Sequence, residues 1–509
     1  MWKKFEEWAK VYGPIYRTEM LGTKFVIVSD DKIIEDLLVK RAKYNSDRPG
    51  VKSLFDSKST HGSGEYLPLM GHNQYWARGR KVSHSYLTQG TNAQYYGFMD
   101  YEVKRWMYRL LKEPHTFQYT LEEMAAKIMC HLVWDDHVHS TKLIPSAWGL
   151  LTQMSPAGPI TNILTPLWEL PLALNPWKRA EHIRHDNQQA FWLERLNQVR
   201  SEIATGAARS SFTRQYLDMA DKSPLSGDHE ASSCLGMLAI VGVFTIGGPL
   251  NYFLLAMIYH PEAQARAQDE ILRVLGDRPP TLSDMPRLPY LRAIIRETMR
   301  WRPNVPTGVA HETERDDYYN GYFIEKGTRI LPLDCALLKD PKKYPDPNNY
   351  RPERWVEPGW PTYQEPLTQY PTLKGMSSFG YGQRQCLGMA LTQDELFISC
   401  GTLLHYFNLR KALDANGQEI SPDPDKSCSL LIIKPDDFQM RFEIRSEEKR
   451  REVIDSWEGA EKEFETKRQR ERAEGMEKRT VTKGEVERIV EEKLARVGVD
   501  AVEVANLAA

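Results

Sequence analysis

The segment Phe379–Gly388 combines residue types that can hold a reactive thiolate. Glycines, aromatic residues, an arginine and a cysteine lie within its ten residues, and the glycines predict a constrained loop. A helical pattern follows from Met389 to Leu404, so the loop delivers Cys386 to a helix N-terminus, where free N–H groups favour a thiolate. Such a thiolate is a nucleophile or a ligand to a soft or redox-active metal. A buried structural cysteine is the plainer alternative.

The order of residues in this loop resembles the haem-binding loop of the cytochromes P450. Phe379, Gly382, Arg384, Cys386 and Gly388 match every signature position of that loop. The resemblance implies that Cys386 is the axial thiolate ligand of the iron of haem b (iron protoporphyrin IX). It also implies that Arg384 meets a haem propionate and that Phe379 and Gly382 belong to the cofactor-binding loop. A thiolate ligand favours O–O cleavage.

Trp76, Arg80 and His311 are further candidates for cofactor binding. Trp76 and Arg80 are four residues apart and share one helix face, where a cation–π or surface pair is the plain alternative. The Trp-x-x-x-Arg pattern resembles the family helix that binds a haem propionate, and a guanidinium matches both oxygens of a carboxylate. His311 lies where the family places a His or Arg near a propionate, although Ala310 stands where proline is common.

A second set of charged residues is predicted to be structural. Glu297 and Arg300 lie three apart on an amphipathic helix predicted over residues 291–300, a spacing that is usually a solvated surface pair. With Arg354 they resemble the family's Glu-x-x-Arg helix and Pro-Glu-Arg-aromatic loop. The resemblance implies a buried network of these three residues, which we expect to fix the loop that carries Cys386.

Residues 232–260 contain no aspartate, glutamate, lysine or arginine. About 20 apolar residues are typical of a transmembrane helix, but the glycines and Pro249 in the middle, and the lack of a basic flank, favour a helix buried on all sides. In the family a long helix crosses the distal face of the haem with an Ala/Gly-Gly-x-Asp/Glu-Thr-Thr pattern. The segment Val241–Ile246 is the best local match.

Thr245 is the candidate catalytic residue of that helix. Its hydroxyl can donate to dioxygen at the haem, and Gly242 is expected to let oxygen or substrate approach. The acid that usually precedes the threonine is Phe244 here, and a phenyl ring cannot relay protons. A water chain or a substrate group would then replace the acid. The alternatives are a peroxide-driven or isomerising enzyme, a haem-binding protein with low turnover, and a plain back-bonded helical threonine at Thr245.

The rest of the sequence predicts a mainly α fold with small β-sheets, in one large domain over residues 1–445. The charged, helical residues 446–509 lie outside the family resemblance and are expected to be a solvated appendage, with an interaction segment or a surface helix as the alternatives. A long loop is predicted over residues 46–72. Strands are predicted at residues 15–18, 24–28, 307–312 and 322–328. Helices are predicted at residues 5–12, 31–40, 100–136 and 179–207.

The composition limits the partners of the chain. The net charge of −2 gives no case for nucleic acid, and six cysteines without paired spacing argue for a reducing compartment. No flavin or dinucleotide fingerprint is present. The resemblance therefore implies electrons from NADPH through a separate NADPH–cytochrome P450 reductase, which Arg78, Lys81 and Lys374 are predicted to dock.

The resemblance implies a haem-thiolate monooxygenase that inserts one oxygen atom from O₂ into an apolar small molecule. The motifs resemble those of fungal microsomal members, which suggests secondary-metabolite biosynthesis. The apolar, proline-rich run over residues 156–177 is either a loop packed on the core or a membrane-facing substrate lid. The expected location is the cytosolic face of the endoplasmic reticulum membrane. Because the sequence begins without the family's anchor helix, a cytoplasmic location is the alternative.

Overall fold

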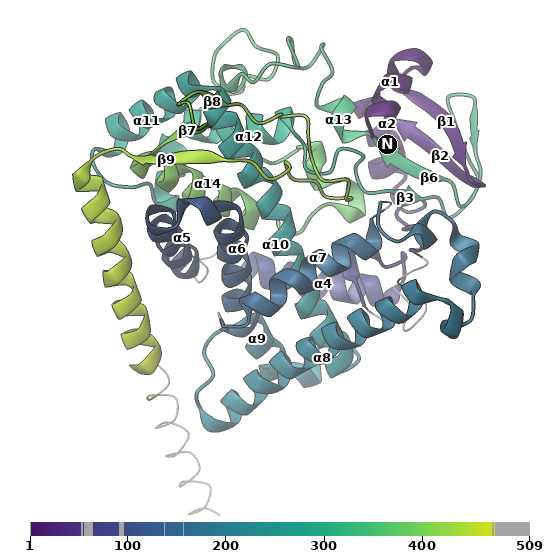
Figure 1. Ribbon diagram of the computed structural model, residues 1–509. Helices are drawn as coiled ribbons and strands as arrows, with labels where there is room; N and C mark the ends of the chain where they lie inside the picture. The colour runs from purple at the N-terminus through teal and green to yellow at the C-terminus, as the bar shows by residue number, and fades with distance from the viewer. Residues whose placement is uncertain are drawn as a thin grey trace, which may run out of the picture.

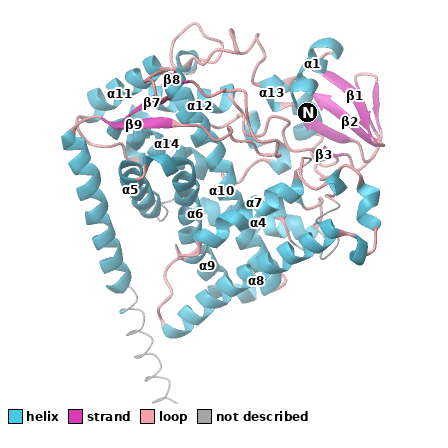
Figure 2. Cartoon of the chain, in the orientation of Figure 1, coloured by secondary structure: helices cyan, strands magenta, loops and turns pink. Residues whose placement is uncertain are grey.

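The computed structural model describes residues 2–470 except for 52–53, 55–64, 91–95, 137 and 156, and it also describes residue 473. Helices form most of the described chain, and the strands form three small sheets near its edges (Figure 2). The predicted fold class, mainly α with small sheets, is confirmed. Much of the predicted 46–72 loop lies outside the described residues.

The first sheet joins the two halves of the chain. Helix α1 (Trp2–Tyr12) leads into the hairpin of β1 (Ile15–Met20) and β2 (Thr23–Val28), and β2 pairs in parallel with β6 (Arg329–Pro332). Strand β3 (His311–Glu312) completes the order β1-β2-β6-β3. The strand expected over residues 307–312 is therefore much shorter than predicted.

The remaining strands form two smaller sheets. Strands β4 (Asp317–Tyr319) and β5 (Tyr322–Ile324) form a hairpin, so the strand predicted to reach residue 328 ends early. Strands β8 (Glu419–Ile420), β7 (Phe407–Leu413) and β9 (Met440–Ile444) form the third sheet in that order.

The helices follow the predicted pattern closely. The α-helices after α1 are α2 (Asp31–Ile34), α4 (Gln74–Gly90), α5 (Tyr96–Lys112), α6 (Phe117–Trp134), α7 (Ser140–Met154), α8 (Pro176–Thr205), α9 (Phe212–Asp218), α10 (Asp228–Tyr259), α11 (Pro261–Leu275), α12 (Pro289–Trp301), α13 (Asp334–Leu337) and α14 (Met389–Tyr406). The π-helix η1 (Glu35–Lys40) continues α2 directly. The 3₁₀ turns are η3 (Leu67–Leu69), η4 (Pro114–Thr116), η5 (Ile160–Asn162), η6 (Thr165–Glu169), η7 (Leu172–Leu174), η8 (Ala220–Lys222), η9 (Leu282–Arg287), η10 (Pro352–Trp355), η11 (Ser377–Phe379) and η12 (Gly382–Arg384).

Helix α10 is the centre of the fold. It packs against α6, α7, α8, α12 and α14, and it runs through the middle of the molecule (Figure 1). In the described part of the chain it alone is long and apolar enough to cross a membrane, and most of its apolar stretch is buried within the protein. Its composition therefore reflects a buried core helix, as the glycines and Pro249 indicated.

Residues 447–470 form a helix that packs on α5. The ring of Phe464 stacks on Tyr101 with centroids 4.3 Å apart, and the ring of Trp457 lies 5.2 Å from the same tyrosine. Trp457 is buried. The expectation of a solvated appendage is therefore wrong for this part of the chain. It concerned the whole range 446–509, which is described only up to residue 470 and at residue 473.

Candidate functional site

The loop before α14 turns sharply because two of its glycines have positive φ angles. Gly380 has φ +71° and Gly382 has φ +53°, a left-handed conformation that favours glycine. A Cβ atom on Gly382 would lie 2.2 Å from the carbonyl oxygen of Leu38, so the loop contacts the backbone of η1 directly. The N–H of Cys386 donates to the Phe379 carbonyl at 2.7 Å. Cys386 is thereby held just before α14 begins.

Cys386 differs from the other cysteines in its exposure. Four are buried and one is partly buried, namely Cys130, Cys234, Cys335, Cys400 and Cys428, whereas Cys386 is exposed. Burial among protein atoms nevertheless raises the pKa of its thiol, against the N–H of Gly388 and the charge of Arg80, which lower it. The side chain of Cys386 is therefore accessible although protein atoms surround it. The arrangement suits a metal ligand better than a packing residue.

A tryptophan and two arginines gather beside the cysteine. The guanidinium of Arg384 lies 4.3 Å from the centroid of the Trp76 ring, and that of Arg80 lies 5.8 Å from it. Arg384 donates to the backbone carbonyl oxygens of Ser46 and Met70 at 2.6 and 2.9 Å. The structure thus brings together residues from α4 and from the cysteine loop, as the family resemblance implied.

Arg48 is a member of this group that the sequence did not reveal. Its Nη1 donates to the carbonyl of Ala310 at 2.6 Å, next to His311. The Nδ1 of His311 lies 2.8 Å from the carbonyl oxygen of Asn45. Both side chains are buried. Arg48 stands in no spacing relation to the other motifs, so only the fold identifies it. We call Arg48, Arg80, His311 and Arg384 the cationic cluster.

No member of the cationic cluster forms an ion pair with a carboxylate in the described part of the chain, although the charges of Asp47 and Glu314 partly offset those of the arginines. Burial and the charges of Arg48 and Arg80 lower the pKa of Arg384 to about 8. Burial and Arg80 lower the pKa of Arg48 to about 9, and burial and Arg48 hold the pKa of His311 well below its usual range. The Nη1 of Arg384 is buried and has no hydrogen-bond partner. Such a set fits bound carboxylates, and the two propionates of a haem are of this kind.

Glu297, Arg300 and Arg354 meet in a fully buried network. Arg300 binds both carboxylate oxygens of Glu297 at 2.8 Å, and Arg354 lies 3.1 Å from one of them. Trp355 donates to the other oxygen at 3.0 Å. The two arginines also donate to carbonyl oxygens of residues 338–349. One carboxylate therefore organises a long irregular segment around α12.

This network does not contact the Cys386 loop itself, so the expected role is corrected. Arg292 and Arg296, which lie on the same helix as Glu297, donate to carbonyl oxygens in residues 367–372. These two arginines tie α12 to the segment that leads into the loop.

Asp334 anchors the beginning of the loop and was not predicted. Its carboxylate accepts hydrogen bonds from the hydroxyls of Ser377 and Ser378. Burial raises the pKa of Asp334 to about 6, although both serines oppose this shift. The acid lies more than forty residues before the loop in sequence, which is why no local motif marks it.

Helix α10, which the resemblance places on the distal side, has a short accessible face. Val241, Gly242 and Thr245 are partly exposed, while most residues of the helix around them are buried. The hydroxyl of Thr245 donates to the Val241 carbonyl at 2.6 Å, which is the back-bonded arrangement. Phe244 is buried. The described distal face thus offers one hydroxyl and no acid at the position before it.

Close packing between two helices explains why a glycine stands at position 242. A Cβ atom there would lie 2.4 Å from Cγ of Met129 on α6. The glycine therefore allows α6 and α10 to approach closely. The expectation that Gly242 lets oxygen or substrate approach the helix stays a prediction, because Gly242 is partly exposed although its Cβ direction points to another helix.

Of the three basic residues predicted to dock a reductase, one is already paired. Arg78 donates two hydrogen bonds of 2.7 Å to the carboxylate of Glu230. Lys81 and Lys374 are exposed. Lys81 and Lys374 therefore remain as the predicted contacts for a reductase.

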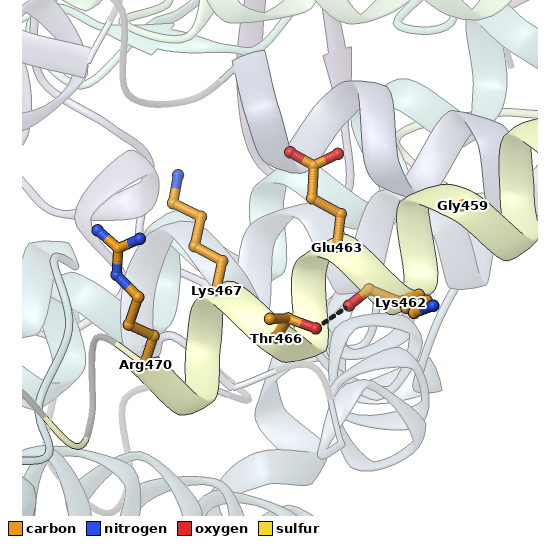
Figure 3. Close-up of a pocket in the computed structure, with 6 residues that line it drawn as sticks. All are labelled: Gly459, Lys462, Glu463, Thr466, Lys467 and Arg470. Atoms are coloured by element: carbon orange, nitrogen blue, oxygen red, sulfur yellow. Dashed lines mark hydrogen bonds between the residues drawn. The ribbon is translucent and has the colours of Figure 1, made fainter.

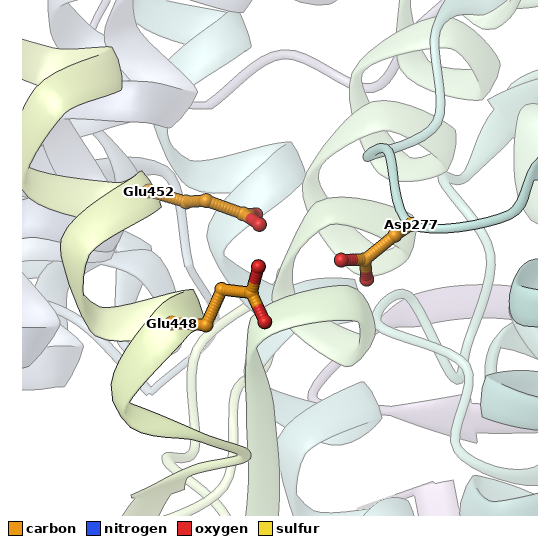
Figure 4. Close-up of side chains that lie close together, drawn as sticks. All are labelled: Asp277, Glu448 and Glu452. Atoms are coloured by element: carbon orange, nitrogen blue, oxygen red, sulfur yellow. The ribbon is translucent and has the colours of Figure 1, made fainter.

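Two other features near the C-terminal helix do not make a cofactor site. A pocket of about 520 Å³ is lined by Gly459, Lys462, Glu463, Thr466, Lys467 and Arg470. All six belong to one helix, as Figure 3 shows, so this pocket is an open surface feature. Asp277, Glu448 and Glu452 also lie close together (Figure 4), but Lys449 pairs with the first at 2.6 Å and with the last at 2.9 Å.

Comparisons with known proteins identify the family of the chain. The family model described as cytochrome P450 matches residues 1–442. The cytochrome P450 monooxygenase virE of Hypocrea virens is 31% identical over 468 residues, covering 89% of this chain and 83% of that protein. The cytochrome P450 monooxygenase fogE of Aspergillus ruber is 29% identical and covers 89% of this chain and 85% of its own length.

A solved structure shows the same fold. A zebra fish cytochrome P450 with progesterone superposes with a TM-score of 0.69 at 22% identity, covering 87% of this chain and 99% of that one. The chain belongs to the cytochrome P450 family, whose members bind haem. It is an oxidoreductase, and the two relatives described above are fungal cytochrome P450 monooxygenases.

Proposed function

We propose that the protein is a haem-thiolate monooxygenase that inserts one oxygen atom of O₂ into an apolar small molecule. The observation that carries this proposal is the anion-deficient cationic cluster beside an accessible Cys386. Haem b, when bound, supplies the iron at which dioxygen is activated. The Sγ atom of Cys386 would ligate that iron.

The other residues have distinct roles in this proposal. The guanidiniums of Arg48, Arg80 and Arg384 would bind the propionates, and the orphaned Nη1 of Arg384 would gain an acceptor. The Nδ1 of His311 already donates to the Asn45 carbonyl, so its Nε2 would donate to a propionate only in the protonated imidazole, which a bound anion favours. Trp76 would hold Arg384 in place through the contact of its ring with the guanidinium.

Thr245 would deliver a proton on the distal side. Its hydroxyl donates to Val241 in the structure, so it must turn away from that carbonyl to donate elsewhere. With Phe244 in place of an acid, the proton reaches Thr245 through water or through a polar group of the substrate. The peroxide-driven, isomerising and low-turnover alternatives are less favoured, because the similar fungal proteins are named monooxygenases.

The substrate class and pathway follow from the apolar distal face and the fungal relatives. The accessible face of α10 offers Val241 and Gly242 beside a single hydroxyl, which suits an apolar molecule. Fungal monooxygenases among the relatives support a role in secondary-metabolite biosynthesis.

Electrons would come from NADPH through a separate NADPH–cytochrome P450 reductase. Exposed Lys81 and Lys374 are the proposed contacts for an acidic partner. Charge reversal of both lysines should slow electron transfer at low salt and leave the haem in place. Unchanged transfer would refute this contact. Arg78→Met is not informative here, because Arg78 is bound to Glu230.

The segment before α8 is proposed to contact the endoplasmic reticulum membrane on its cytosolic side. Three short 3₁₀ turns, η5, η6 and η7, replace a continuous helix, and they expose large apolar side chains. These are Ile160, Ile163, Leu164, Leu170, Leu172 and Leu174. The proposed range begins at residue 156, which lies outside the described residues. Replacing Leu172 and Leu174 with serine should weaken binding to phosphatidylcholine vesicles, and unchanged binding would refute the contact.

The division of the chain into a haem domain (1–445) and a tail (446–509) also belongs to the proposal. It is supported by the family match, which ends at residue 442. The helical part of the tail packs on that domain, as its contacts with Tyr101 show.

A substrate-binding screen tests the proposed function. The purified haem protein would be titrated with apolar small molecules, and perturbation of its haem absorption spectrum would identify those that bind near the iron. A molecule that binds should stimulate NADPH consumption in the presence of the reductase and yield an oxygenated product. Binding without NADPH consumption or product would contradict monooxygenation.

A further inference from the structure

The distal helix contains a proline four residues after Thr245. In an α-helix the carbonyl of residue 245 accepts from the N–H of residue 249, but Pro249 has no N–H. The proline ring also crowds the carbonyl four residues before it. Both effects act on Thr245, the candidate catalytic residue. Helix α10 nevertheless continues through this point to Tyr259.

Asn304 supplies a donor for this carbonyl. It lies in the segment that follows α12 and is buried. Its Nδ2 donates to the carbonyl oxygen of Thr245 at 3.4 Å. Its own carbonyl accepts the N–H of Ile433 at 2.7 Å. One residue therefore links the interrupted point of α10 to two other segments of the chain.

Gly248 allows these segments to meet. A Cβ atom on Gly248 would lie 2.9 Å from the Ile433 carbonyl oxygen and 3.2 Å from Cβ of Asn304. A larger residue would push α10 away from the asparagine and break the contact with Thr245. The glycine, the proline and the asparagine therefore act as one unit, although the asparagine is more than fifty residues distant in sequence.

We propose that Asn304 is a positioning residue for Thr245: it replaces the hydrogen bond that Pro249 removes, and so fixes the backbone of Thr245 on the distal face. The proposal deepens, and rests on, the role given to Thr245 above. A buried carbonyl without a donor favours local opening or bending of the helix. The direction of the Thr245 hydroxyl follows the backbone that carries it, so loss of Asn304 should disturb proton delivery.

The first test is a double-mutant cycle measured by hydrogen exchange in the haem-loaded protein. Asn304→Leu keeps the size of the side chain but loses the donor, and it should speed amide exchange in peptides covering residues 245–255 by about 10-fold. Pro249→Ala restores the missing N–H. In that background Asn304→Leu should change exchange less than about 2-fold. Equal acceleration with and without Pro249, or none in either, would overturn the proposal.

Asn251 provides a matched control on the same helix. Its Nδ2 donates to the carbonyl of Gly247 at 2.8 Å, but that carbonyl also has its regular helical donor, the N–H of residue 251. Asn251→Leu therefore removes a similar side-chain hydrogen bond that no proline has made necessary. Pro249→Ala should not alter the effect of Asn251→Leu on exchange. Rescue of both variants would mean that the alanine stabilises α10 in general, which contradicts a specific replacement by Asn304.

A second readout separates this proposal from the proposed function. With reductase, NADPH and O₂, two electrons and two protons that do not serve oxygen insertion convert O₂ to hydrogen peroxide. Asn304→Leu should raise peroxide released per NADPH about 3-fold at unchanged haem content, and the double variant should return to the level of Pro249→Ala. If the exchange cycle holds while peroxide release does not move, the helix repair by Asn304 is supported and the role of Thr245 is refuted.

Discussion

The two sides of the proposed haem site are built from opposite chemistry. On the cysteine side, buried arginines and a buried carboxylate are tied to backbone carbonyls and to one another. On the distal side, residues 232–259 of α10 contain no charged group, and its shape depends on small residues and on side chains that bond to its backbone. Charge is buried where it is paired or where an anion binds. Elsewhere the site is kept apolar, which suits dioxygen and an apolar substrate.

The contrast predicts that the two sides fail in different ways. The cysteine side should be sensitive to the loss of a charge or a hydrogen bond, because removal of one partner leaves another buried group unpaired. The distal side should be sensitive to added volume, because helices meet there at glycines. The following experiments test that difference.

The largest effect is expected from Glu297→Gln. The substitution leaves the guanidiniums of Arg300 and Arg354 buried without a counter-charge, which typically destabilises by about 3–5 kcal/mol. Denaturant unfolding should show this loss. The matched control is Glu7→Gln, since Glu7 pairs with Lys4 at the same spacing but on the surface. If Glu7→Gln lowered the free energy of unfolding as much as Glu297→Gln does, burial would not be the reason that the network stabilises the protein.

The next effect concerns the cationic cluster. Arg384→Met removes the only guanidinium with an orphaned buried nitrogen in the described cluster, and we expect haem affinity to fall about 10–100-fold, as for a lost charge-assisted hydrogen bond. Haem transfer to apomyoglobin measures this. Arg78→Met removes a charge from the helix that carries Arg80, but Arg78 is paired with Glu230, so it should leave haem affinity unchanged. Equal losses in both variants would refute a specific propionate contact.

On the distal side, Gly242→Ala should destabilise by about 1–3 kcal/mol through overpacking. The new methyl group would lie 2.4 Å from the side chain of Met129. Gly247→Ala is the matched control, because its nearest neighbour would be Glu122 at 3.7 Å. It should gain up to about 1 kcal/mol from helix propensity. Equal effects of the two alanines on thermal unfolding would contradict the close contact between α6 and α10.

The last prediction concerns how stability changes with pH, and its effect is small for each pH unit. Glu395 lies buried on α14 with one oxygen unpaired, and burial raises its pKa from 4.5 to about 8. The unfolded chain loses this proton first, so the wild type should lose stability relative to Glu395→Gln as pH rises from 4.5 to 8. The slope is at most about 1.4 kcal/mol per pH unit. Parallel stability curves for the two proteins would refute this assignment.

The sequence predicted most of the cysteine side because its residues lie in short motifs. Spacing alone placed Trp76 with Arg80, and Glu297 with Arg300, on shared helix faces. Arg48 and Asp334 were missed because each acts on residues that are distant in the chain. The packing role of Gly242 was missed because its close neighbour, Met129, lies on another helix, and no local pattern records that contact.

The tail shows a different kind of error. Mixed charge with sparse apolar positions suggested a solvated segment. A few apolar residues nevertheless suffice to dock the helix: Val453 is buried, and Trp457 and Phe464 meet Tyr101 on α5. The surface that they meet is assembled by the fold and is not visible in the tail's own sequence.

The central claim is that Cys386 ligates the haem iron through its thiolate. The most direct measurement is the absorption spectrum of the reduced, CO-bound protein, recorded for the wild type and for Cys386→Ala at equal haem content. We predict the thiolate-type spectrum for the wild type and its loss in the variant, while Cys428→Ala keeps it. A wild type without the thiolate signature, or a Cys386→Ala variant that retains it, would contradict this account of the site.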